Sequence, residues 1–152
     1  HLAYLSQSTL GDNEIVVRSE VQQILEAAKR NNPPRRITGA LLYSGGLFCQ
    51  LLEGPKSELE VTFEAILADD RHEHIEVLFF DPAPDRLFGV WAMAFAGIEK
   101  EARFDIQGVR SSVDQIHARK TGGNMIEALS RLVADRQRAL GPSGPLLAQV
   151  AH

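Results

Sequence analysis

The chain has 152 residues and a mass of 16.8 kDa, which is the size of one domain with at most a short extension. Its formal net charge of −4 gives no general attraction to nucleic acid or anionic membranes, and no apolar run approaches the ~20 residues of a membrane-spanning helix. A single cysteine, Cys49, excludes an internal disulfide framework. We therefore expect a cytoplasmic protein without a signal peptide that binds neither membranes nor nucleic acid directly.

The N-terminal part predicts a strand, a loop and a helix. Residues 1–6 alternate well enough to form a strand, and residues 7–17 contain the glycine and polar side chains of a loop. A capping box predicts that a helix begins near Ser19. The two prolines at 33–34 end this helix, because the residue before a proline avoids helical geometry. Its apolar stripe consists of Val21, Ile24, Leu25 and Ala28.

Residues 37–53 predict a β-hairpin, because two apolar runs flank Ser44-Gly45-Gly46. Gln50 is a polar side chain in the middle of the second run, and burying its amide without a partner costs roughly 1–3 kcal/mol. Cys49 faces the other way as a small core residue. The partner of Gln50 is therefore the central functional question.

The following segment predicts a helix and two strands. A second capping box opens the helix at Ser57, which ends near Asp69-Asp70. Strands are expected over residues 76–80 and 90–95, with Trp91 and Met93 on the same face of the last one. The order β-α-β-β-α-β-β predicts an α+β fold, a ferredoxin-like sheet with two helices on one face.

The C-terminal part predicts two more helices, over residues 111–120 and 124–140, divided by Thr121-Gly122-Gly123. A ferredoxin-like sheet leaves one face bare, so we expect these helices to cover it. The predicted organisation is a domain over residues 1–98, a helical cap or output extension over 99–140, and a flexible tail over 141–152.

The sequence contains no Walker, GxGxxG, CxxC, HExxH or GxSxG motif. Neither His72 and His74, two residues apart, nor the Asp69-Asp70 pair predicts a metal site, because exposed turns have the same composition. What remains is a polar set in apolar surroundings: Tyr4, Asn32 and Gln50. The first and third strands form the centre of the predicted sheet, which makes Tyr4 and Gln50 neighbours. Taken alone, such a network is more often structural than catalytic.

Several short motifs together resemble one known family. The chain is similar to the BLUF domain, the FAD-binding blue-light sensor module, over residues 1–95. The matching motifs are Tyr4-x-Ser6, Asn31-Asn32, Ile37-Thr38-Gly39, Tyr43-Ser44, Phe48-x-Gln50-x-Leu52-Glu53-Gly54-Pro55, Asp69-x-Arg71-His72 and Phe88-x-x-Trp91-x-Met93.

The resemblance implies non-covalent binding of FAD, with FMN or riboflavin as substitutes. The flavin ring would lie between Ile24 and Ile66. Asn32 would bond the N3/O4 edge, with Asn31, Arg71 and His72 toward the ribityl and phosphate groups. Gln50 would lie between Tyr4 and flavin N5/O4. Light would move an electron and then a proton from Tyr4, and Gln50 would rearrange by rotation or tautomerisation.

The resemblance also implies an output route. Relatives place a residue corresponding to Trp91 or Met93 near the glutamine, and the last strand leads into residues 100–140. Some relatives carry an arginine where Ala65 stands, so Arg71 with Arg30 or Arg35 would hold the anionic groups. Too few residues remain for an output enzyme domain. We therefore expect a short BLUF photoreceptor, not an enzyme, that forms a homo-oligomer and signals to a partner protein: a response regulator, a transcription factor or a cyclic-di-GMP enzyme.

Two alternatives come from other functional classes. A small ferredoxin-like flavin-dependent enzyme would turn over a substrate in the dark. An interaction module that is not photoactive would be colourless and would still fold and bind a partner.

Overall fold

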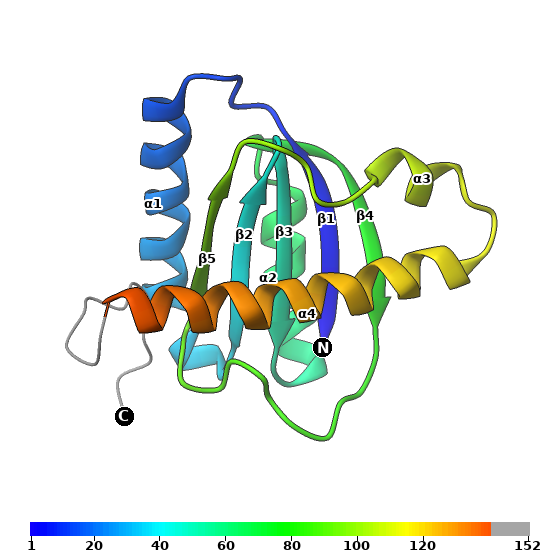
Figure 1. Ribbon diagram of the computed structural model, residues 1–152. Coiled ribbons are helices and arrows are strands. Elements are labelled where there is room, and N and C mark those ends of the chain that lie inside the picture. The colour runs from blue at the N-terminus through cyan, green and yellow to red at the C-terminus, as the bar shows by residue number, and fades with distance from the viewer. Residues whose placement is uncertain (141–152) are drawn as a thin grey trace.

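The fold is organised around one five-stranded sheet, seen in a computed structural model that describes residues 1–140 (Figure 1). The strand order is β4-β1-β3-β2-β5, with β5 parallel to β2 and the other neighbours antiparallel. The strands are β1 (Leu2–Ser8), β2 (Thr38–Ser44), β3 (Leu47–Glu53), β4 (His72–Phe80) and β5 (Ala94–Glu99). The predicted α+β class, the ferredoxin-like order and the central position of the first and third strands are confirmed.

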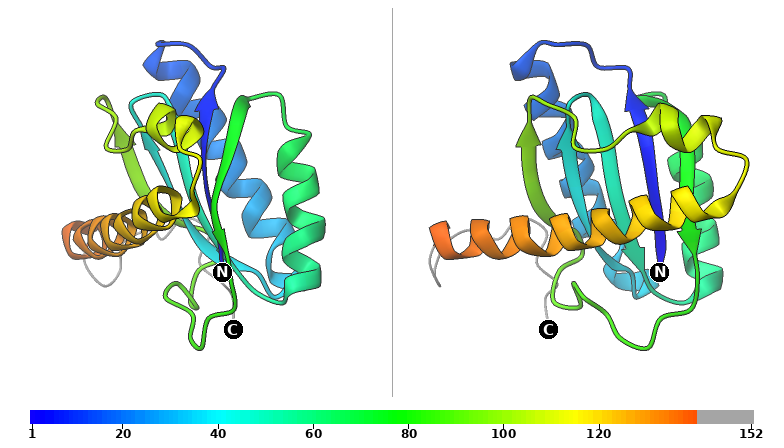
Figure 2. Two further views of the ribbon diagram at one scale, coloured as in Figure 1. Left: turned by 90° about the vertical axis from the view of Figure 1, so that its right-hand side faces the viewer. Right: turned by 45° about the vertical axis from the view of Figure 1, so that its right-hand side comes forward.

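Helices cover both faces of this sheet (Figure 2). On one face lie α1 (Glu14–Asn31) and α2 (Lys56–Leu67), with the 3₁₀ turn η1 (Pro33–Arg35) after α1. On the other face α4 (Gln115–Leu140) crosses the strands, preceded by the short α3 (Ile106–Ser111). The apolar side chains accordingly form two clusters, one on each side of the sheet. The prediction that C-terminal helices cover the second face is confirmed.

The predicted hairpin of β2 and β3 and its glycine turn are confirmed. Gly45 and Gly46 form its two-residue turn with φ of 57° and 81°, a conformation that favours glycine. Gly45 is needed for space as well, because a Cβ there would lie 2.1 Å from the backbone nitrogen of Ala102. Every residue of both strands is buried, because helices cover the sheet on both sides.

The predicted helix starts are corrected by local capping. Helix α1 begins at Glu14, more than one turn before Ser19, because the Asn13 side chain accepts hydrogen bonds from the backbone nitrogens of Ile15 and Val16. Helix α2 begins at Lys56 directly after Pro55, and no side-chain cap at Ser57 opens it. The segment predicted as a loop over residues 7–17 thus contributes to a strand and a helix.

The predicted division of the C-terminal helices at Gly122-Gly123 is wrong. Helix α4 runs through both glycines, and Gly122 is buried where the helix crosses Phe79 of β4. A Cβ at Gly122 would lie 2.6 Å from the Phe79 ring, so glycine allows close approach here and does not break the helix. The tail predicted over residues 141–152 lies outside the described residues. Within residues 1–140, no helix has the length and apolarity required to cross a bilayer.

The bounds of the last two strands also differ from prediction. β4 begins at His72 because it pairs with β1 from Ser8 to Leu2, so His72 is a strand residue. β5 begins at Ala94, where pairing with Ala40 of β2 starts, so Trp91 and Met93 lie in the irregular segment before it. Alternation within a strand therefore does not apply to these two side chains.

Gly122→Ala and Gly123→Ala form a matched pair that tests the close approach of α4. Each substitution improves helix propensity by about 0.5–1 kcal/mol, and no atom lies within 4 Å of a Cβ at Gly123. We expect Gly123→Ala to stabilise the protein, and Gly122→Ala to destabilise it by about 1–2 kcal/mol because Phe79 must move. Urea unfolding measures both; equal stabilisation by the two variants would contradict the packing.

Candidate functional site

A cavity of about 680 Å³ lies between the sheet and the two helices α1 and α2. The sheet forms its floor, and α1 and α2 supply the facing side chains Ile24 and Ile66. All of the residues predicted to bind the cofactor or to act with it line this cavity: Tyr4, Ile24, Asn31, Asn32, Gln50, Ile66, Arg71 and His72. Met93 also lines it, and Trp91 is not among the lining residues.

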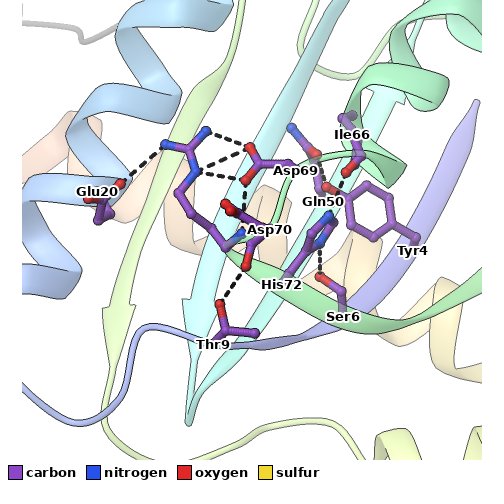
Figure 3. A network of polar contacts seen from close by, with 10 residues as sticks. Tyr4, Ser6, Thr9, Glu20, Gln50, Ile66, Asp69, Asp70 and His72 are labelled. Carbon is purple, nitrogen blue, oxygen red and sulfur yellow. Dashed lines mark hydrogen bonds and ion pairs between the residues drawn. The ribbon is translucent and has the colours of Figure 1, made fainter.

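Tyr4 and Gln50 meet at the floor of the cavity. They are directly opposite in the β1–β3 ladder, and the Tyr4 hydroxyl donates a hydrogen bond to Gln50 Oε1 (Figure 3). Both side chains are buried, and the alternate residue Cys49 packs in the cluster on the α4 side. Burial, with a smaller contribution from the charge of Asp69, raises the pKa of the Tyr4 phenol. Tyr4 is therefore a neutral hydrogen-bond donor at physiological pH.

The other end of the Gln50 amide contacts Met93. Gln50 Nε2 lies 3.4 Å from Met93 Sδ, which accepts a hydrogen bond but has no proton to donate. The amide orientation with Oε1 toward Tyr4 therefore satisfies both ends of Gln50, whereas the flipped orientation would place Oε1 against a sulfur without a donor.

Trp91 occupies the opposite side of the sheet from Met93. Its ring packs against Phe88, 6.4 Å between centroids, and joins the apolar cluster beneath α4. Met93 belongs to the cluster on the cavity side. The prediction that Trp91 and Met93 share a face is wrong, because both lie before the first residue of β5.

Asn32 links the cavity to the same segment. It is the C-cap residue of α1, it is buried, and its Nδ2 donates to the backbone oxygen of Ala92 at 2.8 Å. The bond to Ala92 uses one of the two N–H groups of the Asn32 amide, so the amide oxygen and the second N–H can serve a molecule in the cavity. Asn31, the last residue of α1, is exposed at the edge of the cavity.

Arg71 connects α1 to the turn that follows α2 through two carboxylates. Its guanidinium binds Asp69 at 2.5 Å, and Glu20 of α1 at 3.4 Å. The hydrogen bonds from Arg71 hold the pKa of Asp69 below its usual value, and Asp69 in turn raises the pKa of Arg71. Sequence reasoning missed Glu20 because its partner lies 51 residues away.

His72 lines the cavity beside Tyr4 and is held there by two hydrogen-bond partners. Its Nε2 donates to the backbone oxygen of Ile66 at 2.6 Å, and its Nδ1 lies 2.6 Å from Ser6 Oγ. Its ring stands edge-on to Tyr4, 6.2 Å between centroids. Both nitrogens of His72 are thus engaged by protein groups, which fixes the ring across β1, β4 and the end of α2.

The cavity also contains a polar group that the sequence did not reveal. Thr62 lines it from α2, and in residues 1–140 Thr62 Oγ1 is the one buried side-chain polar atom without a hydrogen-bond partner. Arg30 and Arg35 line the cavity as well, and Arg35 is paired with Glu58 at 3.2 Å. Aliphatic walls, an amide-rich floor and guanidinium groups fit a flat heteroaromatic ring with a polar, anionic tail.

No cluster of three or more His, Cys, Asp or Glu side chains able to hold a metal ion occurs within residues 1–140. Asp69 and Asp70 have different partners. Asp69 binds Arg71, and the backbone oxygen of Asp70 accepts a hydrogen bond from the Thr9 hydroxyl.

Asp69→Asn tests the contribution of the Arg71 pair to stability. Because the folded-state pKa of Asp69 is lowered, this stabilisation is fully present above the ordinary Asp pKa of about 4 and is lost as pH falls below it. We expect the variant to lose about 1 kcal/mol at pH 7 and to show a shallower loss of stability between pH 5 and 2. Asp70→Asn, exposed beside it, is the control in urea unfolding across this range. An unchanged acid limb in Asp69→Asn would contradict the assignment.

Comparison with known proteins identifies the family. The family model for BLUF, "Sensors of blue-light using FAD", matches residues 1–94. The blue light- and temperature-regulated antirepressor BluF of Escherichia coli is 35% identical over 100 residues, 66% of this chain and 24% of that protein. The photoactivated adenylate cyclase subunit beta of Euglena gracilis is 34% identical over 104 residues, 68% of this chain and 12% of that protein.

This chain therefore spans about a quarter or less of the length of these two relatives. Among solved structures, the dark-state structure of the BLUF protein BlrB is 28% identical, with a TM-score of 0.64 over 90% of this chain and 95% of that one. The family match covers more than half of the 152 residues, in the part that forms the sheet and the cavity. The chain belongs to the BLUF family, the sensors of blue light that use FAD.

Proposed function

We propose that this chain is a blue-light photoreceptor in which Tyr4 and Gln50 form the light-driven switch and FAD occupies the cavity between α1 and α2. The observation that carries the proposal is the buried row from the Tyr4 hydroxyl through the Gln50 amide to the sulfur of Met93. This row lines a cavity large enough for a ring system, and each member has a different hydrogen-bonding capacity.

The lining residues fit the flavin in distinct ways. Ile24 and Ile66 would hold the two faces of its ring, because they face the cavity from opposite helices. The amide oxygen of Asn32 and the hydroxyl of Thr62 would serve its polar groups. Asn31 and Arg71, with Arg30 beside them, would contact the ribityl and phosphate groups, and His72 would line that end while supporting Tyr4.

Bound FAD supplies a chromophore that absorbs blue light and becomes a one-electron oxidant when excited. Tyr4 would give up one electron, and its phenolic proton would leave along the hydrogen bond to Gln50. Electron loss has to come first or together with proton loss, because burial raises the pKa of the phenol and opposes a phenolate. Electron and proton then return to Tyr4, so the cycle causes no net oxidation.

After this cycle Gln50 would remain in an altered state. Its amide would return in a rotated or tautomeric form that presents a new hydrogen bond toward the cavity. In the rotated form Oε1 faces Met93, which has no proton to donate, so the contact that holds Met93 in the dark is lost. Light would thus weaken the attachment of the segment that precedes β5.

The output would travel from that segment to the C-terminal helices. Met93 is followed directly by β5, and α4 packs on β5 and β2. Arg136 of α4 also reaches the cavity-side cluster, because its guanidinium carbon lies 4.6 Å from the ring centroid of Phe95. Residues 1–98 would then act as the sensor and residues 99–140 as the output extension, despite their close packing.

The receiver would be a partner protein in the cytoplasm, reached through α4 or through a change in homo-oligomer state. The relatives support this kind of output, because one is named as an antirepressor and another as a cyclase subunit.

Gln50→Leu tests the switch. The variant keeps the apolar walls and should bind FAD, but its side chain has no hydrogen-bonding group to rearrange. We expect the flavin absorption band to shift to longer wavelength under blue light in the wild type and to stay unshifted in Gln50→Leu. Absorption spectra before and after illumination measure this. Cys49→Ala, the neighbouring residue on the other face, should retain the shift.

Tyr4→Phe tests the electron and proton donor separately. It removes only the hydroxyl that donates to Gln50, so flavin binding should persist while the reversible shift is lost. A normal light-induced shift in both the Gln50 and Tyr4 variants would refute the proposed mechanism. A wild-type protein that binds no flavin would refute the proposed function itself.

A further inference from the structure

Glu53, the last residue of β3, is a fully buried carboxylate that the proposed light cycle does not use. Four donors surround it. Oε1 accepts from Thr38 Oγ1 and the backbone nitrogen of Phe88, both at 3.0 Å. Oε2 accepts from the backbone nitrogen of Leu87 at 2.6 Å and contacts His1 Nε2 at 3.1 Å. Burying a carboxylate is costly, so these donors have to be held in place around it.

Two of the donors belong to the loop between β4 and β5. The backbone amides of Leu87 and Phe88 both point at Glu53, one to each oxygen. Arg86 fastens the same part of the loop, because its guanidinium donates to the backbone oxygen of Arg36 at 2.8 Å and to Thr38 Oγ1 at 3.0 Å. The loop is therefore fixed at residues 86–88, well before it re-enters the sheet at Ala94.

The segment over residues 88–93 thus connects two points on one strand. At its first residue, the Phe88 amide donates to Glu53. At its last residue, the Met93 sulfur accepts from Gln50, three residues before Glu53 on β3. Between these points it is held by Asn32 at the Ala92 oxygen, and the Trp91 nitrogen donates to the Phe88 oxygen at 3.1 Å. With both ends fixed, the position of residue 88 constrains which side chain of the segment faces the cavity.

We propose that Glu53 is a positioning residue for the switch: by fixing the amides of Leu87 and Phe88, it keeps Met93 against Gln50 and Trp91 on the opposite face. This role rests on the proposed function of Gln50, but it concerns a residue outside the cavity. A carboxylate suits it because its two oxygens both accept, so adjacent backbone amides are bound at once. A glutamine would present an NH₂ group to one of these N–H donors.

Glu53→Gln provides the test, because Trp91 is the only tryptophan of the chain. Protein labelled with 5-fluorotryptophan gives one ¹⁹F signal that reports the surroundings of Trp91. We expect a single resonance in flavin-loaded wild-type protein in the dark, and a second or shifted resonance in Glu53→Gln, because residue 88 is released and Trp91 leaves its packing against Phe88. The variant should still bind flavin, since Glu53 does not line the cavity.

Glu99→Gln is the matched control. It removes a carboxylate charge from β5, where Glu99 binds Ser44 and Arg103, without touching residues 86–93. Its ¹⁹F spectrum should equal that of the wild type. An unchanged spectrum in folded Glu53→Gln would overturn the proposal, and so would the same change in Glu99→Gln.

A measurement on the unmodified protein covers the case in which Glu53→Gln does not fold. The Leu87 and Phe88 amides lie outside the sheet, yet their bonds to a buried carboxylate should make them exchange with deuterium at least tenfold more slowly than the amides of the exposed residues Ala83 and Asp85. Equal exchange rates in the two sets of amides would overturn the proposal that Glu53 holds Leu87 and Phe88 in place. Both measurements are made in the dark, so an absent light-induced absorption shift would refute the proposed function without deciding the role of Glu53.

Discussion

The hydrogen bond from Tyr4 to Gln50 is the interaction around which the rest of the site is arranged. It joins the two central strands of the sheet, β1 and β3, on a face where an unsatisfied amide would be expensive. Gln50 therefore needs a partner for its nitrogen too, and Met93 supplies the acceptor. Because a thioether cannot donate, Tyr4 and Met93 together select one orientation of the Gln50 amide. A change in either partner would therefore change the orientation that the amide prefers.

In the proposed function, this change acts on the short segment before β5. Three side chains from two elements hold it: Glu53 and Gln50 of β3, the latter through Met93, and Asn32 at the end of α1. Apart from a single β-bridge at Trp91, the segment belongs neither to a strand nor to a helix, so these side-chain contacts hold it in place. A region held by a few side-chain contacts can shift when one of them changes, which suits the moving part of the proposed switch.

The two faces of the sheet differ in the side chains that they carry, and β5 contributes residues to the clusters on both faces. The cavity side holds the polar pair and the helices α1 and α2, while the α4 side is an apolar layer closed by the approach of Gly122 to Phe79. β5 is an edge strand, so α4 can contact both sides of it there, including Phe95 through Arg136. A displacement of β5 would therefore change its contacts with α4 on the opposite face of the sheet.

Sequence alone determined the order of the elements, the glycine-turned hairpin and the opposite directions of Cys49 and Gln50, because these follow from local periodicity and turn chemistry. Through the family resemblance it also singled out several residues that line the cavity, among them Tyr4, Asn32 and Gln50, but not Thr62. Tertiary structure decided the rest. Where β5 begins, and hence the separation of Trp91 from Met93, depends on pairing with β2, more than 50 residues away. The unbroken course of α4 and the burial of Glu53 depend on distant partners, Phe79 and the loop at 87–88, that no local pattern reveals.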